Sequence, residues 1–175
     1  MRTLGLICLL TVSCVATVPQ EPLRQAKAQA MAANFNKHKD RVKEKYGVRT
    51  VKYLDVRSEP VVRQNLSDYA GAYQAGDLGY VINIRVASDG NIQINGNDQS
   101  RSFRIENARI EGALLTGSKI YQDGINDKFE GVFINRTSRN SVTDVGVTKF
   151  GLGVVLTTPV EVNGNSYDRM FFEKQ

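Results

Sequence analysis

The longer, C-terminal part of this chain alternates apolar and polar residues with a period of two, and this alternation constrains the fold more than any other feature. In the segment 79–86, the residues Tyr80, Ile82, Ile84 and Val86 lie at every second position. Because successive side chains of a β-strand point to opposite faces, this spacing places one face in a core and the other in water. The pattern predicts half-buried antiparallel strands.

Turn signals separate the alternating segments. Asp-Gly or Asn-Gly occurs within 88–91, within 95–98, at 123–124 and at 163–164. These dipeptides suit the positive φ angles of tight hairpin turns. A turn at roughly every ten residues and about eight strands are typical of an antiparallel sandwich or barrel.

Glycines within or beside the strand patterns favour the barrel. Interior glycines weaken a strand unless they mark a bulge, a bend or a close backbone approach, and sheets that close on themselves need such points. We therefore expect a mainly β fold, an antiparallel barrel or half-barrel of about eight strands, preceded by one N-terminal amphipathic helix. The glycines in question are Gly71, Gly112, Gly131, Gly151 and Gly153.

The preceding segment 21–46 is rich in Ala, Gln, Lys, Arg and Glu, which are good helix formers. Met31, Phe35, His38 and Val42 are spaced four, three and four residues apart. That spacing places them on one stripe of a helix, which needs a partner surface. We read His38 as a packing residue of this stripe rather than as a ligand or a base.

Charge divides the chain at the same place. Residues 20–65 carry eleven Lys or Arg against five Asp or Glu, whereas residues 66–175 carry eleven against thirteen. A basic segment of this kind indicates contact with an anionic membrane surface, here through residues 24–45. We expect three parts: 1–16 as a signal peptide, 17–65 as a basic helix and connector, and 66–175 as the β domain.

The first residues resemble an export signal. Residues 4–15 form an apolar stretch too short to span a bilayer, and cleavage after Ala16 fits the small residues there. We expect a periplasmic or secreted protein; lipid attachment through Cys14 is the alternative, because the preceding residues resemble a bacterial lipobox. Cys8 and Cys14 are the only cysteines, so the mature chain would have no disulfide and no thiolate nucleophile.

One short stretch resembles a known family. In residues 66–74, Tyr69-x-Gly71-x-Tyr73 resembles the first strand of small lipocalin-like β modules, which occur singly in exported bacterial proteins and attached to serine hydrolases of the β-lactamase type. Residues 79–94 resemble the hairpin that follows in those modules. The resemblance implies a barrel or half-barrel and no catalysis, since the hydrolase domain is absent. The chain departs from typical lipocalins because it contains no Trp.

Aromatic residues of the β domain are the candidate lining of an apolar pocket inside a barrel. A filled core is the simpler interpretation of the same residues, because eight strands leave room for one small ligand at most. The candidate ligand-binding residues are Tyr69, Tyr73, Tyr80, Phe133 and Phe150, with Tyr121 and Phe172 as further members of the set.

Other chemistries are poorly supported. His38 is the only histidine, so a Ser-His-Asp triad or a histidine-ligated zinc site could be built on that residue alone. Asp123, Asp127 and Glu130 are close in sequence, but their spacing does not match an EF-hand, and we read them as a solvated hairpin turn. We expect no cofactor and no metal.

The sequence thus favours an exported, non-enzymatic binding or structural module of the bacterial cell envelope. Its partner would be a small apolar ligand or an envelope protein, and an exported location argues against nucleic acid. Two alternatives stay open: an exported hydrolase that uses two carboxylates, and a membrane-surface anchor that works through the basic helix. The oligomeric state is not constrained by the sequence.

Overall fold

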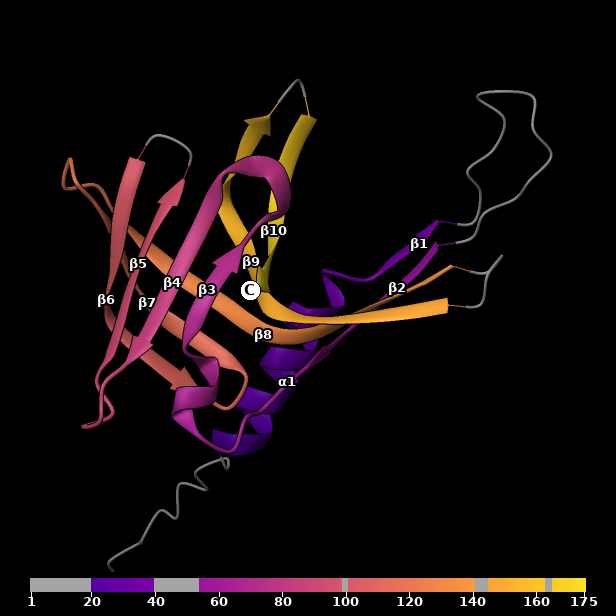
Figure 1. Ribbon diagram of the computed structural model, residues 1–175, viewed down its shortest axis with the longest axis horizontal. Helices are drawn as coiled ribbons and strands as arrows, with labels where there is room; N and C mark the ends of the chain where they lie inside the picture. Colours follow the sequence, from indigo (N-terminus) through magenta and orange to yellow (C-terminus); the bar gives the residue numbers. More distant parts are fainter. Residues whose placement is uncertain (1–19, 40–53, 99–100, 141–144, 163–164) are drawn as a thin grey trace, which may run out of the picture.

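The computed structural model describes residues 20–39, 54–98, 101–140, 145–162 and 165–175 (Figure 1). Strands β3 to β10 form a closed, eight-stranded antiparallel barrel, as the sequence predicts. The elements are α1 (Gln20–Ala33), β1 (Lys37–Lys39), β2 (Leu54–Pro60), η1 (Leu66–Tyr69), β3 (Gly71–Gln74), η2 (Gly76–Leu78), β4 (Tyr80–Val86), β5 (Ile92–Asp98), β6 (Arg101–Glu111), β7 (Leu114–Tyr121), β8 (Asn126–Asn140), β9 (Val145–Val162) and β10 (Asn165–Lys174).

The barrel is closed by the pairing of its last strand, β10, with its first, β3. Neighbours in sequence pair from β3 through to β8, and β8 then pairs with β9 and β9 with β10. The last contact is short, because β10 meets β3 only through Glu173 opposite Gln74 and Lys174 opposite Tyr73. The rest of the β9–β10 hairpin stands apart from β3 at one end of the barrel (Figure 1).

The period-two pattern is realised as predicted in β4. Tyr80, Ile82 and Ile84 are buried in the barrel. The turn after β4 is also confirmed, because Gly90 has a φ of 82°. Alternation therefore fixes which face of β4 turns inward, and the Asp-Gly pair fixes where the strand reverses.

The predicted turn at 95–98 is wrong, because these residues lie inside β5. Gly96 pairs with Ile82 on one side and Phe103 on the other. A Cβ atom at Gly96 would lie 2.5 Å from the Phe103 ring, so glycine here permits a close approach instead of a reversal. As a result β5 is longer than expected and ends at Asp98, inside the mouth of the barrel. The Asn-Gly pair at 163–164 lies outside the described residues.

The helix is shorter than the sequence predicts. It ends at Ala33 rather than at residue 46. Phe35 lies in the turn that follows, and its backbone N–H donates to the Ala32 carbonyl. Residues 37–39 form β1, with His38 opposite Asp55 of β2. The pairing of residues 37–39 with β2 therefore overrides the helical spacing that predicted a longer helix. Val42 lies outside the described residues.

Residues 54–60, expected as a connector, form strand β2. They pair with the last part of β8, from Leu54 opposite Asn140 to Pro60 opposite Ile134. Pro60 is the last residue of the strand, where its missing N–H costs no ladder bond. Strands β1 and β2 thus belong to the same ten-stranded sheet as the barrel and extend it beyond the closed part.

Helix α1 packs on the outside of the barrel, beneath this extension (Figure 1). The contact is apolar, and its centre consists of small residues of the helix against branched residues of the sheet. It buries Ala28, Ala32 and Phe35 against Ala113, Leu114, Val132 and Ile134.

Candidate functional site

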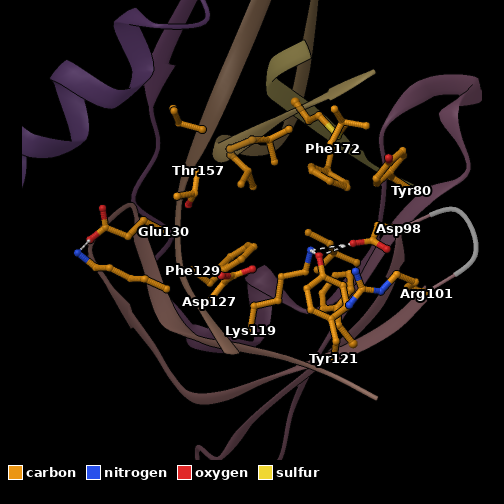
Figure 2. Close-up of a pocket in the computed structure, with 18 of the residues that line it drawn as sticks. Tyr80, Asp98, Arg101, Lys119, Tyr121, Asp127, Phe129, Glu130, Thr157 and Phe172 are labelled. Carbon is orange, nitrogen blue, oxygen red and sulfur yellow. Dashed lines mark hydrogen bonds and ion pairs between the residues drawn. The ribbon is translucent and has the colours of Figure 1, made fainter. Parts of the chain in front are cut away.

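A cavity of about 430 Å³ lies in one end of the barrel, between β4–β8 and the β9–β10 hairpin (Figure 2). One side of it is apolar and consists of inward-facing residues of five strands, which follows from the alternation described above. This apolar floor is made of Ile82, Phe103, Phe129, Val154, Met170 and Phe172.

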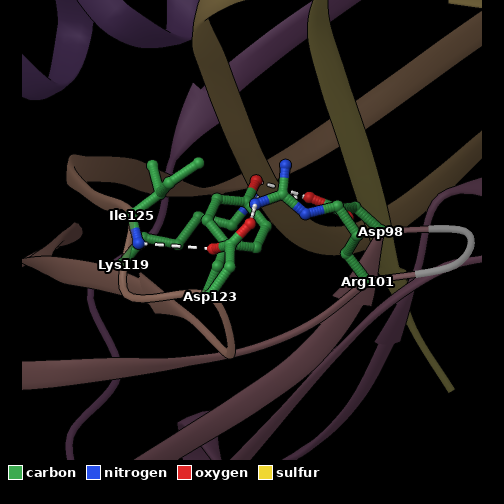
Figure 3. Close-up of polar contacts among 6 residues, drawn as sticks. Asp98, Arg101, Lys119, Asp123 and Ile125 are labelled. Carbon is green, nitrogen blue, oxygen red and sulfur yellow. Dashed lines mark hydrogen bonds and ion pairs between the residues drawn. The ribbon is translucent and has the colours of Figure 1, made fainter.

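Beside this floor lies a group of hydrogen-bonded polar side chains (Figure 3). Lys119 Nζ lies 3.0 Å from Asp98 Oδ2 and donates to Tyr121 Oη at 2.5 Å. Tyr121 Oη in turn donates to Asp98 Oδ2 at 2.5 Å. The Lys119 and Asp98 side chains are only 17% and 16% exposed, so this polar cluster of Asp98, Lys119 and Tyr121 is shielded from bulk water.

Strand register brings the polar cluster together. Lys119 and Tyr121 are two residues apart on β7 and therefore share its inner face. Tyr121 lies opposite Phe103 of β6, and Phe103 lies opposite Gly96 of β5. Asp98, two residues after Gly96, follows on the same face. The long β5 thus delivers the carboxylate that neutralises Lys119.

Arg101 closes the edge of the cluster. Its guanidinium carbon lies 3.9 Å from the centre of the Tyr121 ring, and its Nη2 lies 2.7 Å from Asp123 Oδ2. Lys119 Nζ also lies 4.2 Å from the centre of the Phe103 ring. These cation–π contacts hold both cations against aromatic faces and fix their positions.

The pKa of Tyr121 is raised far above its usual value, first because of burial and second because of the hydrogen bond to Asp98. Burial likewise raises the pKa of Tyr80, and the charge of Asp98 adds to this. Both phenols are therefore neutral at physiological pH, and Tyr121 acts as a hydrogen-bond donor rather than as a base. The two phenols thus offer hydrogen bonds to the cavity in their neutral form.

Two further carboxylates lie at the cavity. Asp127 is opposite Lys119 in the β7–β8 register, and Figure 2 shows it beside Phe129 at the cavity. Glu130 Oε1 lies 2.8 Å from both Lys27 Nζ and Lys128 Nζ. The hydrogen bonds from these lysines lower the pKa of Glu130. A general acid would require the opposite shift.

Four of the five aromatic residues proposed as ligand-binding are not part of the lining of this cavity. Tyr69, Tyr73, Phe133 and Phe150 pack together near η1, at the other end of the barrel. The Tyr69 and Phe133 ring centres are 4.4 Å apart, and Tyr73 Oη donates to the Tyr69 carbonyl at 2.6 Å. These residues form the filled core. Tyr80 and the two further members of the set, Tyr121 and Phe172, line the cavity.

Sequence reasoning missed Lys119, Asp98 and Arg101. One signal was present: Lys119 is a charged residue at an inward position, two residues before Tyr121. Its partner Asp98 lies 21 residues away and becomes a neighbour only through the register of three strands. Asp123, read as part of a solvated turn, is indeed an exposed residue and pairs with Arg101.

The described residues contain no group of three or more His, Cys, Asp or Glu side chains arranged to hold a metal ion. Over the same residues, no helix has the length and apolar character needed to cross a membrane.

Fold and site together define a small antiparallel β-barrel with an amphipathic cavity in its mouth. Comparison of the chain with models of protein families, with curated proteins and with solved structures gives no match.

Proposed function

We propose that this protein is an exported, non-enzymatic binding module of the bacterial cell envelope that holds a small amphiphilic molecule in the mouth of its barrel. The observation that carries the proposal is the cavity of about 430 Å³, whose lining combines the apolar floor with the adjacent polar cluster. Ligand pockets of small molecules have volumes of this order, and they combine apolar walls with a few placed polar groups.

The polar cluster refines the chemistry expected from the sequence. A purely apolar ligand would cover Lys119 and Asp98 without giving either a hydrogen bond, and this desolvation is unfavourable. A ligand with a polar head accepts from Lys119 or donates to Asp98, while its apolar part lies on Ile82, Val154 and Met170. An amphiphile therefore fits both sides of the cavity.

Binding rather than catalysis is supported by the state of the polar groups. Asp98 is engaged by Lys119 and Tyr121, and Glu130 is engaged by two lysines. The hydrolase alternative requires one carboxyl group with a raised pKa, and the shift of Glu130 is in the other direction.

The anchor alternative is also weakened by ion pairs. Arg24 Nε lies 3.0 Å from Glu111, and Lys27 Nζ lies 2.8 Å from Glu130. Two of the basic residues assigned to a membrane contact thus face carboxylates of the barrel. The proposal of export rests on the sequence of residues 1–16, and the resemblance to lipocalin-like modules rests on the sequences of residues 66–74 and 79–94.

A blocking substitution at the mouth tests the proposal. Val155 lines the cavity and is 42% exposed, so Val155→Trp would fill the entrance with little change to the core. Val147, on the same strand, is 50% exposed and does not line the cavity, so Val147→Trp is the matched control. We expect the wild type and Val147→Trp to bind a fluorescent fatty-acid probe with equal affinity, and Val155→Trp to bind at least tenfold more weakly.

Equal binding by both tryptophan variants would place the probe elsewhere and would refute the proposal. The variant Lys119→Met tests the polar head separately. Loss of a hydrogen bond to a charged group costs about 1.5–3 kcal/mol, which is about a tenfold to hundredfold loss of affinity for a probe with a polar head.

A further inference from the structure

A second, smaller cavity of about 180 Å³ lies outside the barrel wall, between the end of α1, strand β8 and strand β10. It is separate from the cavity in the barrel mouth, with which it shares only Met170. Its walls are mostly apolar, with Phe35, Leu78 and Phe171 among them, and two arginines, Arg136 and Arg169, complete the lining. No acidic residue lines it.

Arg136 is the unusual member of this lining. Its Nε is buried and has no hydrogen-bond partner, and its guanidinium carbon lies 5.3 Å from the centre of the Phe171 ring. Among the residues that the structure describes, no carboxylate forms an ion pair with it. Burial lowers the pKa of Arg136, which reports the cost of removing this charge from water. Polar atoms that are buried in proteins normally have a hydrogen-bond partner, and the Arg136 Nε has none among the described residues.

The neighbouring charges are already compensated. Lys149 lies opposite Arg136 on β9, and its Nζ is 2.7 Å from Glu173 Oε2. Arg169 forms two hydrogen bonds with Asp168, at 2.8 and 2.6 Å, and a third with the carbonyl of Asn34. The acidic groups near the cavity are thus engaged by other cations, and Arg136 is left as the uncompensated charge.

We propose that Arg136 binds the phosphate or carboxylate group of a small organic anion, whose apolar part lies against Phe35, Leu78 and Phe171. The planar guanidinium donates two parallel hydrogen bonds to such groups, and a buried charge gains most from a partner of opposite sign. The inference goes beyond the proposed function, because the ligand, the site and the surface differ from those of the barrel mouth.

The test is an NMR titration of the full chain that follows the arginine Nε–H signals. The Arg136 signal is identified as the one missing from Arg136→Gln. Arg85, an exposed residue of β4, provides the internal control and is identified in the same way with Arg85→Gln. The probes are butyrate, butyl phosphate and inorganic phosphate, added separately at constant ionic strength.

We expect at least one probe to shift the Arg136 signal in a saturable manner while the Arg85 signal stays in place. Saturation with inorganic phosphate as tight as with butyl phosphate would assign the site to the free ion. Tighter binding of butyl phosphate or butyrate would assign it to an organic anion. An Arg136 signal that does not move with any probe, or that moves in parallel with Arg85, overturns the proposal.

Two variants keep the test independent of folding. Arg136→Lys retains the charge but loses the planar fork, and we expect it to bind at least about tenfold more weakly. Without any probe, Arg136→Gln should be at least as stable as the wild type, because it removes a half-buried charge that has no ion-pair partner among the described residues. A clear loss of stability in Arg136→Gln would mean that the guanidinium is already satisfied in the free protein, and the proposal would fail.

Discussion

The substitution Phe133→Ala tests whether the aromatic cluster around Phe133 is a filled core and not part of the ligand cavity. The Phe133 side chain is fully buried. Its ring centre lies 4.4 Å from Tyr69, 6.0 Å from Tyr73 and 6.1 Å from Phe150. Large-to-small substitution of a buried phenylalanine costs about 3–5 kcal/mol. Because three ring contacts are lost together, we expect at least the middle of this range, about 4 kcal/mol.

Urea denaturation followed by circular dichroism measures this cost. With a denaturant slope of about 2 kcal/mol/M, a loss of 4 kcal/mol lowers the midpoint by about 2 M at unchanged slope. If Phe133→Ala does not fold at all, Phe133→Leu retains most of the apolar volume and should cost about 1 kcal/mol. Val147→Ala, at an exposed position, should change stability by less than about 0.5 kcal/mol.

The same variants should leave ligand binding unchanged, because Phe133 does not line the cavity in the barrel mouth. A folded Phe133 variant with nearly wild-type stability but without affinity for the fatty-acid probe would refute this reasoning. Such a result would mean that the aromatic cluster takes part in ligand binding.

Two further predictions follow from the structure. Burial raises the pKa of Tyr73 and Tyr121 far above the ordinary value near 10, so the unfolded chain loses these protons first and stability, fully present below pH 10, falls as the pH rises above it. A Tm that stays constant from pH 9 to pH 11 would contradict this, and Tyr121→Phe should reduce the slope. A Cβ atom at Gly153 would lie 2.7 Å from the Phe35 ring, so Gly153→Ala should displace that ring and cost about 1–3 kcal/mol in urea denaturation. In the double variant Gly153→Ala/Phe35→Leu the two costs should be less than additive, and strict additivity would show that the two residues do not touch.

The barrel follows from local patterns. Alternation in β4 and the Asp-Gly turn at Gly90 predict the hairpin, because both the buried face and the reversal are encoded within a few residues. The end of α1 and strand β2 are different. Phe35 fits the helical stripe, and Pro60 argues against a strand. Their actual positions depend on pairing with β8 and on packing against the barrel wall, which are contacts between distant segments.

The site was predictable only in part. Aromatic residues were expected to face inward, and they do, but inward position alone does not separate a filled core from a cavity. Which aromatic residues line a cavity depends on where the pairing of β10 with β3 stops. That position is set by the register of these two strands. The pairing of Lys119 with Asp98 likewise requires the register across β5, β6 and β7.

The most direct measurement of the central claim is an isotope-filtered NOE experiment with isoleucine methyl groups labelled and the bound fatty-acid probe unlabelled. Ile82 and Ile125 line the cavity in the barrel mouth, whereas Ile134 is buried beneath α1 and does not. We expect cross-peaks from the probe's chain to Ile82 and none to Ile134. Cross-peaks to Ile134 without any to Ile82 would place the ligand outside the barrel and contradict the account.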